Sequence, residues 1–240
     1  MNGAVYAVVP AAGAGKRMGS ATPKQYLEIA GRSVLEHTLW RLAGQVLIRK
    51  VVVAISAGDE YFAALRPRLP AKASAVLGGV ERCHSVLAAL HALALDAAAE
   101  DWVMVHDAAR PCVRSADLDR MIATLGDDEV GGILAAPVRD TLKRCSADGA
   151  IVATVDRSQL WHALTPQMFR LGTLTRAIEA ALACGVMVTD EAQAIERAGL
   201  TPRVVAGHAD NLKITHPEDL FLAGLILAAQ DEAAHRGEPQ

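Results

Sequence analysis

The sequence predicts an α/β fold, in which a mostly parallel β-sheet carries helices on both of its faces. The stretch from Lys50 to Ile55 is β-branched and almost wholly apolar, as expected of a strand that is covered on both sides. Apolar stretches of this kind alternate with stretches of helical spacing along most of the chain. The dipeptide Asp148-Gly149 interrupts the alternation and predicts a β-hairpin. We therefore expect a single domain, residues 1–240, in which residues 138–160 form a protruding arm for dimerisation.

Composition narrows the class of protein. The chain has 240 residues, of which 52% are hydrophobic and 21% charged, as in a folded globular protein. A net charge of −3 argues against broad nucleic-acid binding, so local cations must hold any anionic ligand. The four cysteines form no CxxC pair, which favours neither a zinc site nor a disulfide framework. Because we find neither a signal-peptide pattern nor a membrane-spanning run, we expect a cytoplasmic protein.

The first strand, Ala4 to Val9, ends at Pro10 and leads into a loop of small residues. Small side chains let backbone N–H groups approach a phosphate closely, and Arg17 and Lys24 place cations beside this loop. The loop is not a P-loop, because Pro10 and Arg17 replace required residues, and Met18 replaces the third Gly of the dinucleotide fingerprint. An ordinary strand-to-helix turn remains the alternative.

The elements that follow repeat this arrangement. A helix begins after Ser33, a plausible N-cap, and stops at Gly44. A helix from Asp59 to Leu69 and a strand from Ala73 to Leu77 come next. The Gly78-Gly79 pair then leaves the strand, and a helix runs from about Arg82 to Ala98. This second glycine turn predicts either contact with a ligand or a plain turn between strand and helix.

A further strand, Trp102 to His106, is followed by Asp107 and Arg110. Ligands of open α/β sheets bind at the carboxyl ends of strands, so this acid and base lie where chemistry is expected. The alternative is that Asp107 caps a helix or forms a local ion pair with Arg110. A helix from Ser115 to Leu125 and a strand from Gly131 to Pro137 continue the alternation.

The hairpin strands are predicted as Thr141 to Ala147 and Ala150 to Arg157. A two-residue loop at Asp148-Gly149 would pair Ala147 with Ala150 and Leu142 with Val155, and would place Thr141 beside Arg157. A ribbon of two strands is marginally stable alone, so we expect it to lean on a partner chain in a homodimer. The alternative to an arm whose residues take part in a site is an arm that serves dimerisation only.

The last third of the chain is predicted to return to helices and one more strand. We expect a helix from Leu171 to Cys184, a short helix capped at Thr189-Asp190, a strand from Arg203 to Ala206 and a final helix that opens at His216-Pro217. Lys213 has apolar neighbours, which indicates a positioned cation, and a solvated lysine is the alternative.

Eight ordered sequence blocks together point to a known family. They are Pro10-Ala11-Ala12-Gly13-x-Gly15-x-Arg17-Met18, Pro23-Lys24-Gln25-Tyr26, Gly78-Gly79-x-x-Arg82-x-x-Ser85-Val86, His106-Asp107-Ala108-Ala109-Arg110-Pro111, Asp140-Thr141, Thr165-Pro166-Gln167, Thr189-Asp190-Glu191 and Lys213-Ile214-Thr215. From about Ala4 to Leu225 the chain resembles the 2-C-methyl-D-erythritol 4-phosphate cytidylyltransferases of the non-mevalonate isoprenoid pathway. It departs from some relatives at Val80, where they carry an acid, so a side-chain contact from there to the ribose is in doubt.

The resemblance implies a Rossmann-like nucleotidyltransferase fold and a homodimer whose arm reaches the neighbouring site. It implies that CTP and methylerythritol phosphate give 4-diphosphocytidyl-2-C-methyl-D-erythritol and pyrophosphate, with Mg²⁺ or another divalent cation and no metal ligand assigned to the chain. Residues implied to stabilise the transition state are Arg17 and Lys24. Residues implied to position the incoming phosphate are Lys213 and, from the partner chain, Arg157. Residues implied to line the sugar phosphate site are Asp107, Arg110, Thr141, Thr165 and Thr189. Residues implied to hold CTP are Ala11, Ala12, Gly13, Ala14, Gly15, Gly79 and Ser85.

The physical chemistry of this reaction agrees with the residue types. A phosphate monoester is already mostly dianionic at pH 7, since its second pKa is about 6, and it needs no general base. Catalysis should then consist of positioning and of neutralising phosphate charge. A cytidylyltransferase for another sugar or polyol phosphate, and a non-catalytic nucleotide-binding protein, are the alternatives.

Overall fold

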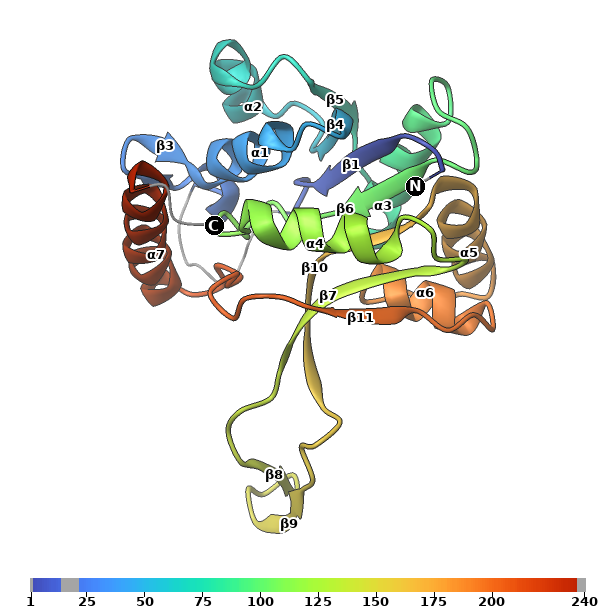
Figure 1. Ribbon diagram of the computed structural model, residues 1–240, viewed down its shortest axis with the longest axis vertical. Coiled ribbons are helices and arrows are strands. Elements are labelled where there is room, and N and C mark those ends of the chain that lie inside the picture. The colour runs from blue at the N-terminus through green and yellow to red at the C-terminus, as the bar shows by residue number, and fades with distance from the viewer. Residues whose placement is uncertain (1, 14–21, 237–240) are drawn as a thin grey trace.

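The computed structural model describes residues 2–13 and 22–236. A seven-stranded sheet with the order β11-β7-β10-β6-β1-β4-β5 forms its centre (Figure 1). The strands of this sheet are β1 (Val5–Pro10), β4 (Ile48–Ile55), β5 (Ala73–Leu77), β6 (Trp102–Val105), β7 (Gly131–Pro137), β10 (Trp161–Arg170) and β11 (Arg203–Ala206). All neighbouring strands are parallel except that β10 runs antiparallel to β6 and β7. The predicted fold class, α/β with a mostly parallel sheet, is confirmed.

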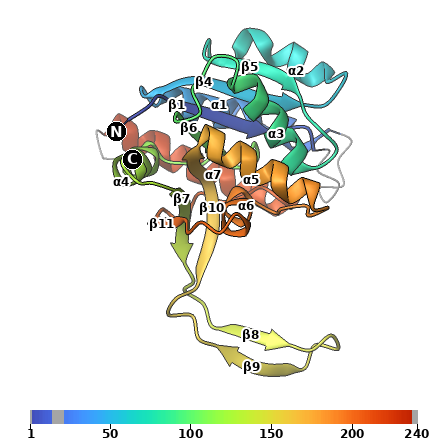
Figure 2. The same cartoon turned by 90° about the vertical axis from the view of Figure 1, so that its right-hand side faces the viewer.

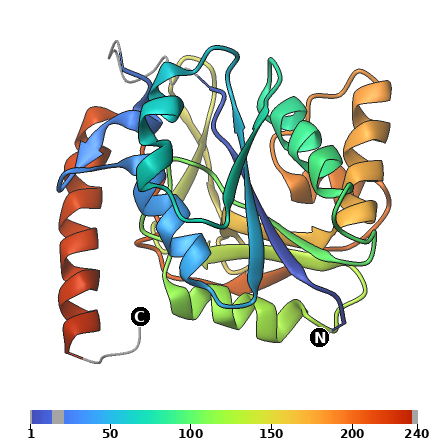
Figure 3. The same ribbon diagram turned by 90° about the horizontal axis from the view of Figure 1, so that it is seen from above.

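Helices cover both faces of the sheet, as Figure 3 shows from above. The longer helices are α1 (Val34–Gly44), α2 (Glu60–Leu65), α3 (Arg82–Leu93), α4 (Ser115–Leu125), α5 (Leu171–Ala183), α6 (Glu191–Arg197) and α7 (Pro217–His235). Strand β1 sends Val5, Ala7 and Val9 into one core with α1, α2 and α4. It sends Tyr6 and Val8 into a second core with α3, α5 and α6. The period-two pattern of one buried strand thus builds both halves of the interior.

Local sequence signals account for most helix boundaries. Helix α1 begins after Ser33, whose hydroxyl accepts from the Glu36 N–H at 3.2 Å while the Glu36 carboxylate accepts from the Ser33 N–H at 2.7 Å. This reciprocal capping box fixes the predicted start. The predicted helix from Arg82 to Ala98 is too long, because α3 ends at Leu93. The Asp101 carboxylate accepts from the Ala98 N–H at 2.8 Å and folds residues 94–101 into turns that enter β6.

The strand β10 was not expected from the sequence. It runs from Trp161 to Arg170, inserts between β6 and β7, and pairs Gln167 with both Val105 and Ile133. Its first three residues are exposed and the following ones are buried, which gives no uniform alternation to recognise. A proline within the strand, Pro166, further weakens the signal.

The arm is a two-stranded hairpin of β8 (Leu142–Cys145) and β9 (Ile151–Val155) that projects from the ends of β7 and β10 (Figures 1 and 2). The predicted hairpin is confirmed, but the two-residue loop from which its register was worked out is not present. The Gly149 N–H donates to the Ser146 carbonyl at 3.0 Å, and the Ser146 N–H donates to the Ala150 carbonyl at 3.0 Å. The loop therefore contains three residues and ends on Gly149, whose φ of +89° favours glycine.

A second irregularity restores the predicted register of the arm. Opposite the step from Arg144 to Cys145, strand β9 accommodates one extra residue, Val152. As a result, Leu142 still pairs with Val155, as predicted. At the open end of the hairpin the Arg157 guanidinium donates to the Thr141 hydroxyl at 3.3 Å.

The two short strands β2 (Glu28–Ile29) and β3 (Arg32–Ser33) form a separate hairpin beside α7. The 3-10 turns η2 (Lys24–Tyr26) and η3 (Arg66–Arg68) complete the described elements. No helix of the described residues is long and apolar enough to cross a membrane. A third apolar cluster, which includes Ile29 and Ile214, joins this edge to the segment that carries Lys213.

Candidate active site

A cavity of about 350 Å³ lies at the carboxyl ends of β1, β5 and β6. This is the edge of a parallel sheet at which ligands of α/β proteins bind. The residues expected from the sequence that line it are Ala11, Gly13, Lys24, Gly79, Ser85, Asp107 and Lys213. Segments that are more than a hundred residues apart in the chain therefore meet in one site.

The described part of the first loop is held by Gln25. This buried amide donates to the Ala11 carbonyl at 2.7 Å and to the Gly13 carbonyl at 3.1 Å. Its neighbour Lys24 donates to the Ile214 carbonyl at 2.8 Å, beside Lys213, and both lysines line the cavity. The predicted site residues Ala14, Gly15 and Arg17 lie outside the described residues.

The Gly78-Gly79 turn is packed too closely for side chains, with Gly78 against the first loop and Gly79 against the start of α3. A Cβ at Gly78 would lie 2.8 Å from the Ala12 Cβ, and one at Gly79 would lie 2.4 Å from the His84 Cβ. The Ser85 hydroxyl accepts from the Gly79 N–H at 3.1 Å and fixes the turn. Packing therefore requires these glycines, and the turn opens onto the cavity through Gly79 and the exposed Val80.

Asp107 is the centre of a cluster of charges on the cavity wall. Its carboxylate accepts from Arg82 Nε at 3.0 Å and from Lys213 Nζ at 2.8 Å, and Arg110 Nε lies 3.6 Å away. Burial raises the pKa of Asp107, but the charges of Arg82 and Lys213 outweigh it and hold this pKa well below its ordinary value. The Lys213 ammonium group is held by Asp107 although its side chain is 39% exposed, so Lys213 is a positioned cation that also contacts solvent.

Arg82 connects this cluster to helix α6. Its two terminal nitrogens donate to both carboxylate oxygens of Glu191, at 2.6 and 3.1 Å, while its Nε contacts Asp107. The Glu191 side chain is only 2% exposed. Burial opposes the charge of Arg82, but the two carboxylates raise its pKa above the ordinary value, so the guanidinium is charged. With Lys24, the cluster has four cations and two carboxylates, which favours an anionic ligand.

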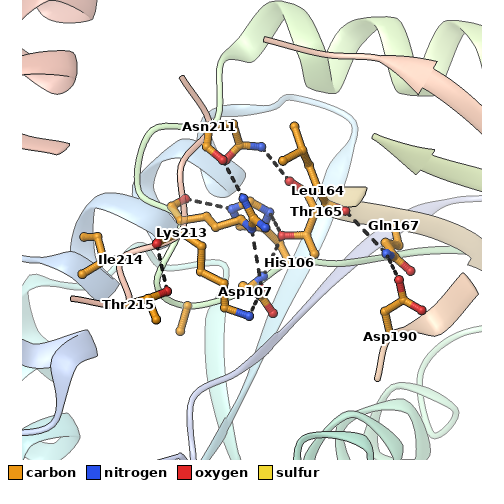
Figure 4. Close-up of polar contacts among 12 residues, drawn as sticks. His106, Asp107, Leu164, Thr165, Gln167, Asp190, Asn211, Lys213, Ile214 and Thr215 are labelled. Carbon is orange, nitrogen blue, oxygen red and sulfur yellow. Dashed lines mark hydrogen bonds and ion pairs between the residues drawn. The ribbon is translucent and has the colours of Figure 1, made fainter. Parts of the chain in front are cut away.

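A layer of buried polar groups lies behind Asp107, shown in Figure 4. The Asp107 N–H donates to the Thr165 hydroxyl at 3.1 Å, and this hydroxyl lies 3.0 Å from His106 Nδ1. Arg110 donates to the Asn211 carbonyl at 2.7 Å. Arg110 and Thr165, both expected to contact substrate, are thus brought to the wall behind the cavity.

Three other predicted site residues do not line the cavity of their own chain. Thr141 and Arg157 are exposed on the arm. Thr189 is exposed beside α6, where its N–H donates to Gln193 Oε1 at 2.8 Å. Of the predicted cap residues Thr189 and Asp190, Asp190 is the N-cap of α6, and its carboxylate accepts from the Gln193 N–H at 2.9 Å.

Sequence reasoning gave no role to four residues that shape the site, namely Gln25, Arg82, Glu191 and Asn211. Arg82 and Glu191 each stand in a quoted block, next to residues that were assigned roles. An Arg at the start of one predicted helix and an acid at the start of another were the available signals. Only the fold shows that the two side chains meet.

Comparison with known proteins identifies the family. The model of the family "IspD: 2-C-methyl-D-erythritol 4-phosphate cytidylyltransferase" matches residues 5–229. The 2-C-methyl-D-erythritol 4-phosphate cytidylyltransferase of Aeromonas hydrophila subsp. hydrophila is 55% identical over 94% of this chain and 90% of its own length. This chain belongs to the IspD family.

Solved structures agree with the IspD assignment. A crystal structure of 4-diphosphocytidyl-2C-methyl-D-erythritol synthase is 39% identical, with a TM-score of 0.82 over 94% of this chain and all of the other. The Francisella tularensis 2-C-methyl-D-erythritol 4-phosphate cytidylyltransferase is 33% identical, with a TM-score of 0.79 over 93% and 99% of the two chains. The eight sequence blocks and the IspD family model cover nearly the same part of the chain.

Proposed function

We propose that this chain transfers the cytidylyl group of CTP to 2-C-methyl-D-erythritol 4-phosphate, in the synthesis of isoprenoid precursors. The products are 4-diphosphocytidyl-2-C-methyl-D-erythritol and pyrophosphate. The observation that carries the proposal is the cavity at the carboxyl ends of the strands, where Arg82 and Lys213 pair with Asp107 and Lys24 lines the same cavity, in a chain of the IspD family.

The reaction is a displacement at the α-phosphorus of CTP. A phosphate oxygen of methylerythritol phosphate forms the new P–O bond, and the bond to the β-phosphate breaks, which releases pyrophosphate. No group of the protein has to remove a proton from the nucleophile, since the monoester is mostly a dianion at neutral pH. The obstacle is the repulsion between two polyanions, and fixed cations lower it.

We assign Arg17 and Lys24 to the transition state and Lys213 to the incoming phosphate. Lys24 supports this assignment because its hydrogen bond to the Ile214 carbonyl places it beside Lys213. A guanidinium can donate to two phosphate oxygens at once, whereas a lysine supplies a point charge, so we expect Arg17→Lys to lower turnover although it keeps the charge. Asp107, with Arg110, Thr165 and Thr189, forms the proposed sugar phosphate site.

CTP is proposed to lie between the two glycine turns. Residues proposed to hold it are Ala11, Ala12, Gly13, Ala14, Gly15, Gly79 and Ser85. The close contact of Gly78 with Ala12 supports this, because it brings two sets of backbone N–H groups to one side of the cavity. The start of α3 adds the positive end of a helix dipole.

We propose that the enzyme is a homodimer in which Thr141 and Arg157 act on the neighbouring chain's substrate. Both residues are exposed on the arm and neither lines the cavity of its own chain. The arm itself presents Ile151 and Val152, which are 66% and 64% exposed. Apolar side chains on an isolated ribbon need a partner surface for stability.

Mg²⁺ is proposed to arrive with CTP. The described residues contain no group of three His, Cys, Asp or Glu side chains that could form a cage, and the Asp107 carboxylate is already paired with cations. This donor set fits an ion bound mainly through substrate phosphates, as is common for Mg²⁺. When bound, it would neutralise phosphate charge.

The decisive experiment measures pyrophosphate release from each of the four nucleoside triphosphates, with and without methylerythritol phosphate and Mg²⁺. We expect release only when CTP, methylerythritol phosphate and Mg²⁺ are all present. Release with a different sugar phosphate in place of methylerythritol phosphate would indicate another cytidylyltransferase. Binding of CTP without any release would refute catalysis.

A further inference from the structure

The side chains of His106, Thr165 and Asn211 form a closed ring of hydrogen bonds with the Asp107–Arg110 turn. The Thr165 hydroxyl contacts both the Asp107 N–H, at 3.1 Å, and His106 Nδ1, at 3.0 Å. His106 Nε2 lies 3.0 Å from the Arg110 carbonyl. Arg110 donates to the Asn211 carbonyl, and the Asn211 amide returns to the Thr165 carbonyl, both at 2.7 Å. His106 and Asn211 are fully buried.

The hydrogen bonds of His106 run from the Arg110 carbonyl through the imidazole to the Thr165 hydroxyl. The groups at the two ends decide which atom donates in each bond. The Arg110 carbonyl can only accept, so His106 Nε2 carries a hydrogen and donates it. Burial lowers the pKa of His106 to about 4, so the ring is neutral at pH 7 and Nδ1 is an acceptor. The Thr165 O–H must then donate to Nδ1, because Nδ1 carries no hydrogen, while the same oxygen accepts from the Asp107 N–H.

This arrangement leaves Thr165 with one remaining lone pair and no hydrogen to offer. Any ligand group that touches this oxygen must therefore be a donor. The hydroxyls of methylerythritol phosphate are donors, whereas the oxygens of its dianionic phosphate are acceptors only. His106 thus determines which part of the substrate Thr165 can recognise, although His106 itself is shielded from the cavity.

We propose that His106 is a positioning residue of this site. It makes Thr165 a pure acceptor, and it holds the turn that carries Asp107 on the cavity wall and Arg110 behind it. The inference rests on the proposed function, because Asp107 and Arg110 are assigned to the sugar phosphate there. The His106 bond to the Arg110 carbonyl closes over the same turn as the backbone bond from the Arg110 N–H to the Asp107 carbonyl, at 3.1 Å.

Kinetics of variants at His106 test the proposal, with pyrophosphate release measured at saturating CTP and Mg²⁺ and varied methylerythritol phosphate. For His106→Leu we expect kcat/KM for methylerythritol phosphate to fall about tenfold to a hundredfold, because displaced contacts cost this much. KM for CTP should stay within about twofold, since the nucleotide contacts are made elsewhere. His106→Asn keeps an acceptor near Nδ1 and should recover part of the loss.

Asp101→Ala is the matched control. Asp101 also holds two backbone groups, the Ala4 N–H at 2.7 Å and the Ala98 N–H at 2.8 Å, but at the start of β6. It lies at the opposite edge of the sheet from the cavity, so its loss should lower the thermal midpoint and leave both KM values unchanged. Equal changes in KM for Asp101→Ala and His106→Leu would overturn a specific role for His106.

A double-mutant cycle with Thr165→Val separates action through Thr165 from general loss of structure. If His106 acts through this hydroxyl, the double variant loses no more kcat/KM than the more damaged single variant. Fully additive losses, or an unchanged KM in His106→Leu, would overturn the inference. If His106→Leu does not fold, His106→Gln is measured instead, because the Gln amide keeps a donor towards the Arg110 carbonyl. An unchanged KM for methylerythritol phosphate in His106→Gln would equally overturn the inference. Inactive wild-type enzyme would instead refute the proposed function.

Discussion

Replacement of Arg82 by Met should destabilise the fold in a way that depends on pH. The variant loses three charge-assisted hydrogen bonds, one to Asp107 at 3.0 Å and two to Glu191 at 2.6 and 3.1 Å. Asp107 keeps Lys213, but Glu191, at 2% exposure, loses its ion-pair partner. Breaking a buried ion pair from one side typically costs about 3–5 kcal/mol. We expect a loss of this size at pH 8.

The pH dependence follows from Glu191. Burial raises its pKa, and the charge of Arg82 holds this rise back in the wild type. Without Arg82 the pKa of folded Glu191 rises further above its unfolded value, so the folded state binds more protons and stability falls as pH increases. Each pH unit between the two pKa values changes the unfolding free energy by about 1.4 kcal/mol. The deficit of Arg82→Met should therefore be smaller at pH 5 than at pH 8.

Urea unfolding at both pH values measures these deficits, with the slope of the transition used to check that the unfolded state is unchanged. Glu191→Gln in the Arg82→Met background removes the buried charge and should recover most of the loss at pH 8. The same variant in the wild-type background is the matched control. A deficit below about 1 kcal/mol at pH 8, far less than a broken buried pair costs, would refute the reasoning. Equal deficits at both pH values would do so as well.

Three further predictions concern catalysis, assembly and acid stability. Lys24→Ala and Lys213→Ala should each lower kcat by about 10²-fold to 10³-fold while circular dichroism shows an intact fold, and near-normal turnover would reject that residue's role. Mixed Arg157→Ala and Asp107→Ala subunits should regain about a quarter of wild-type activity, since random pairing gives one intact site in half of the dimers; no recovery would contradict an arm acting in trans. Because burial lowers the pKa of His106 to about 4, wild-type unfolding free energy should fall relative to His106→Gln by up to about 3 kcal/mol between about pH 6.5 and pH 4, in acid unfolding titrations. A constant difference would mean that His106 titrates normally.

The arm shows what a local sequence signal can and cannot predict. Asp148-Gly149 predicts a hairpin, because glycine tolerates the positive φ that the turn requires. The signal does not fix the number of loop residues, since a three-residue loop followed by the extra residue Val152 gives the same outer pairing as a two-residue loop. The pairing of Leu142 with Val155 was therefore correct although the loop was wrong. Whether the arm reaches its own site or that of a neighbouring chain depends on how two chains pack together, which no local sequence signal defines.

The positions of strand ends were predictable because each is marked locally. Apolar β-branched runs followed by glycine or by a polar residue locate the ends of β1, β5 and β6, and these ends supply Gly13, Gly79 and Asp107. Parallel strands end at the same edge, so the sequence alone brings these three residues together. The pairing of Arg82 with Glu191 depends instead on how α3 and α6 both pack against α5, and no local pattern encodes it.

Strand β10, which the sequence did not predict, accounts for the buried polar groups behind Asp107. Because β10 runs antiparallel beside β6, with Gln167 opposite Val105, it places Thr165 directly behind Asp107. A connection that left β9 and bypassed the sheet would leave His106 Nδ1 without its partner. The residues that strand ends bring to the cavity can thus be predicted from the sequence, whereas the hydrogen bonds behind Asp107 require knowledge of which strands are neighbours.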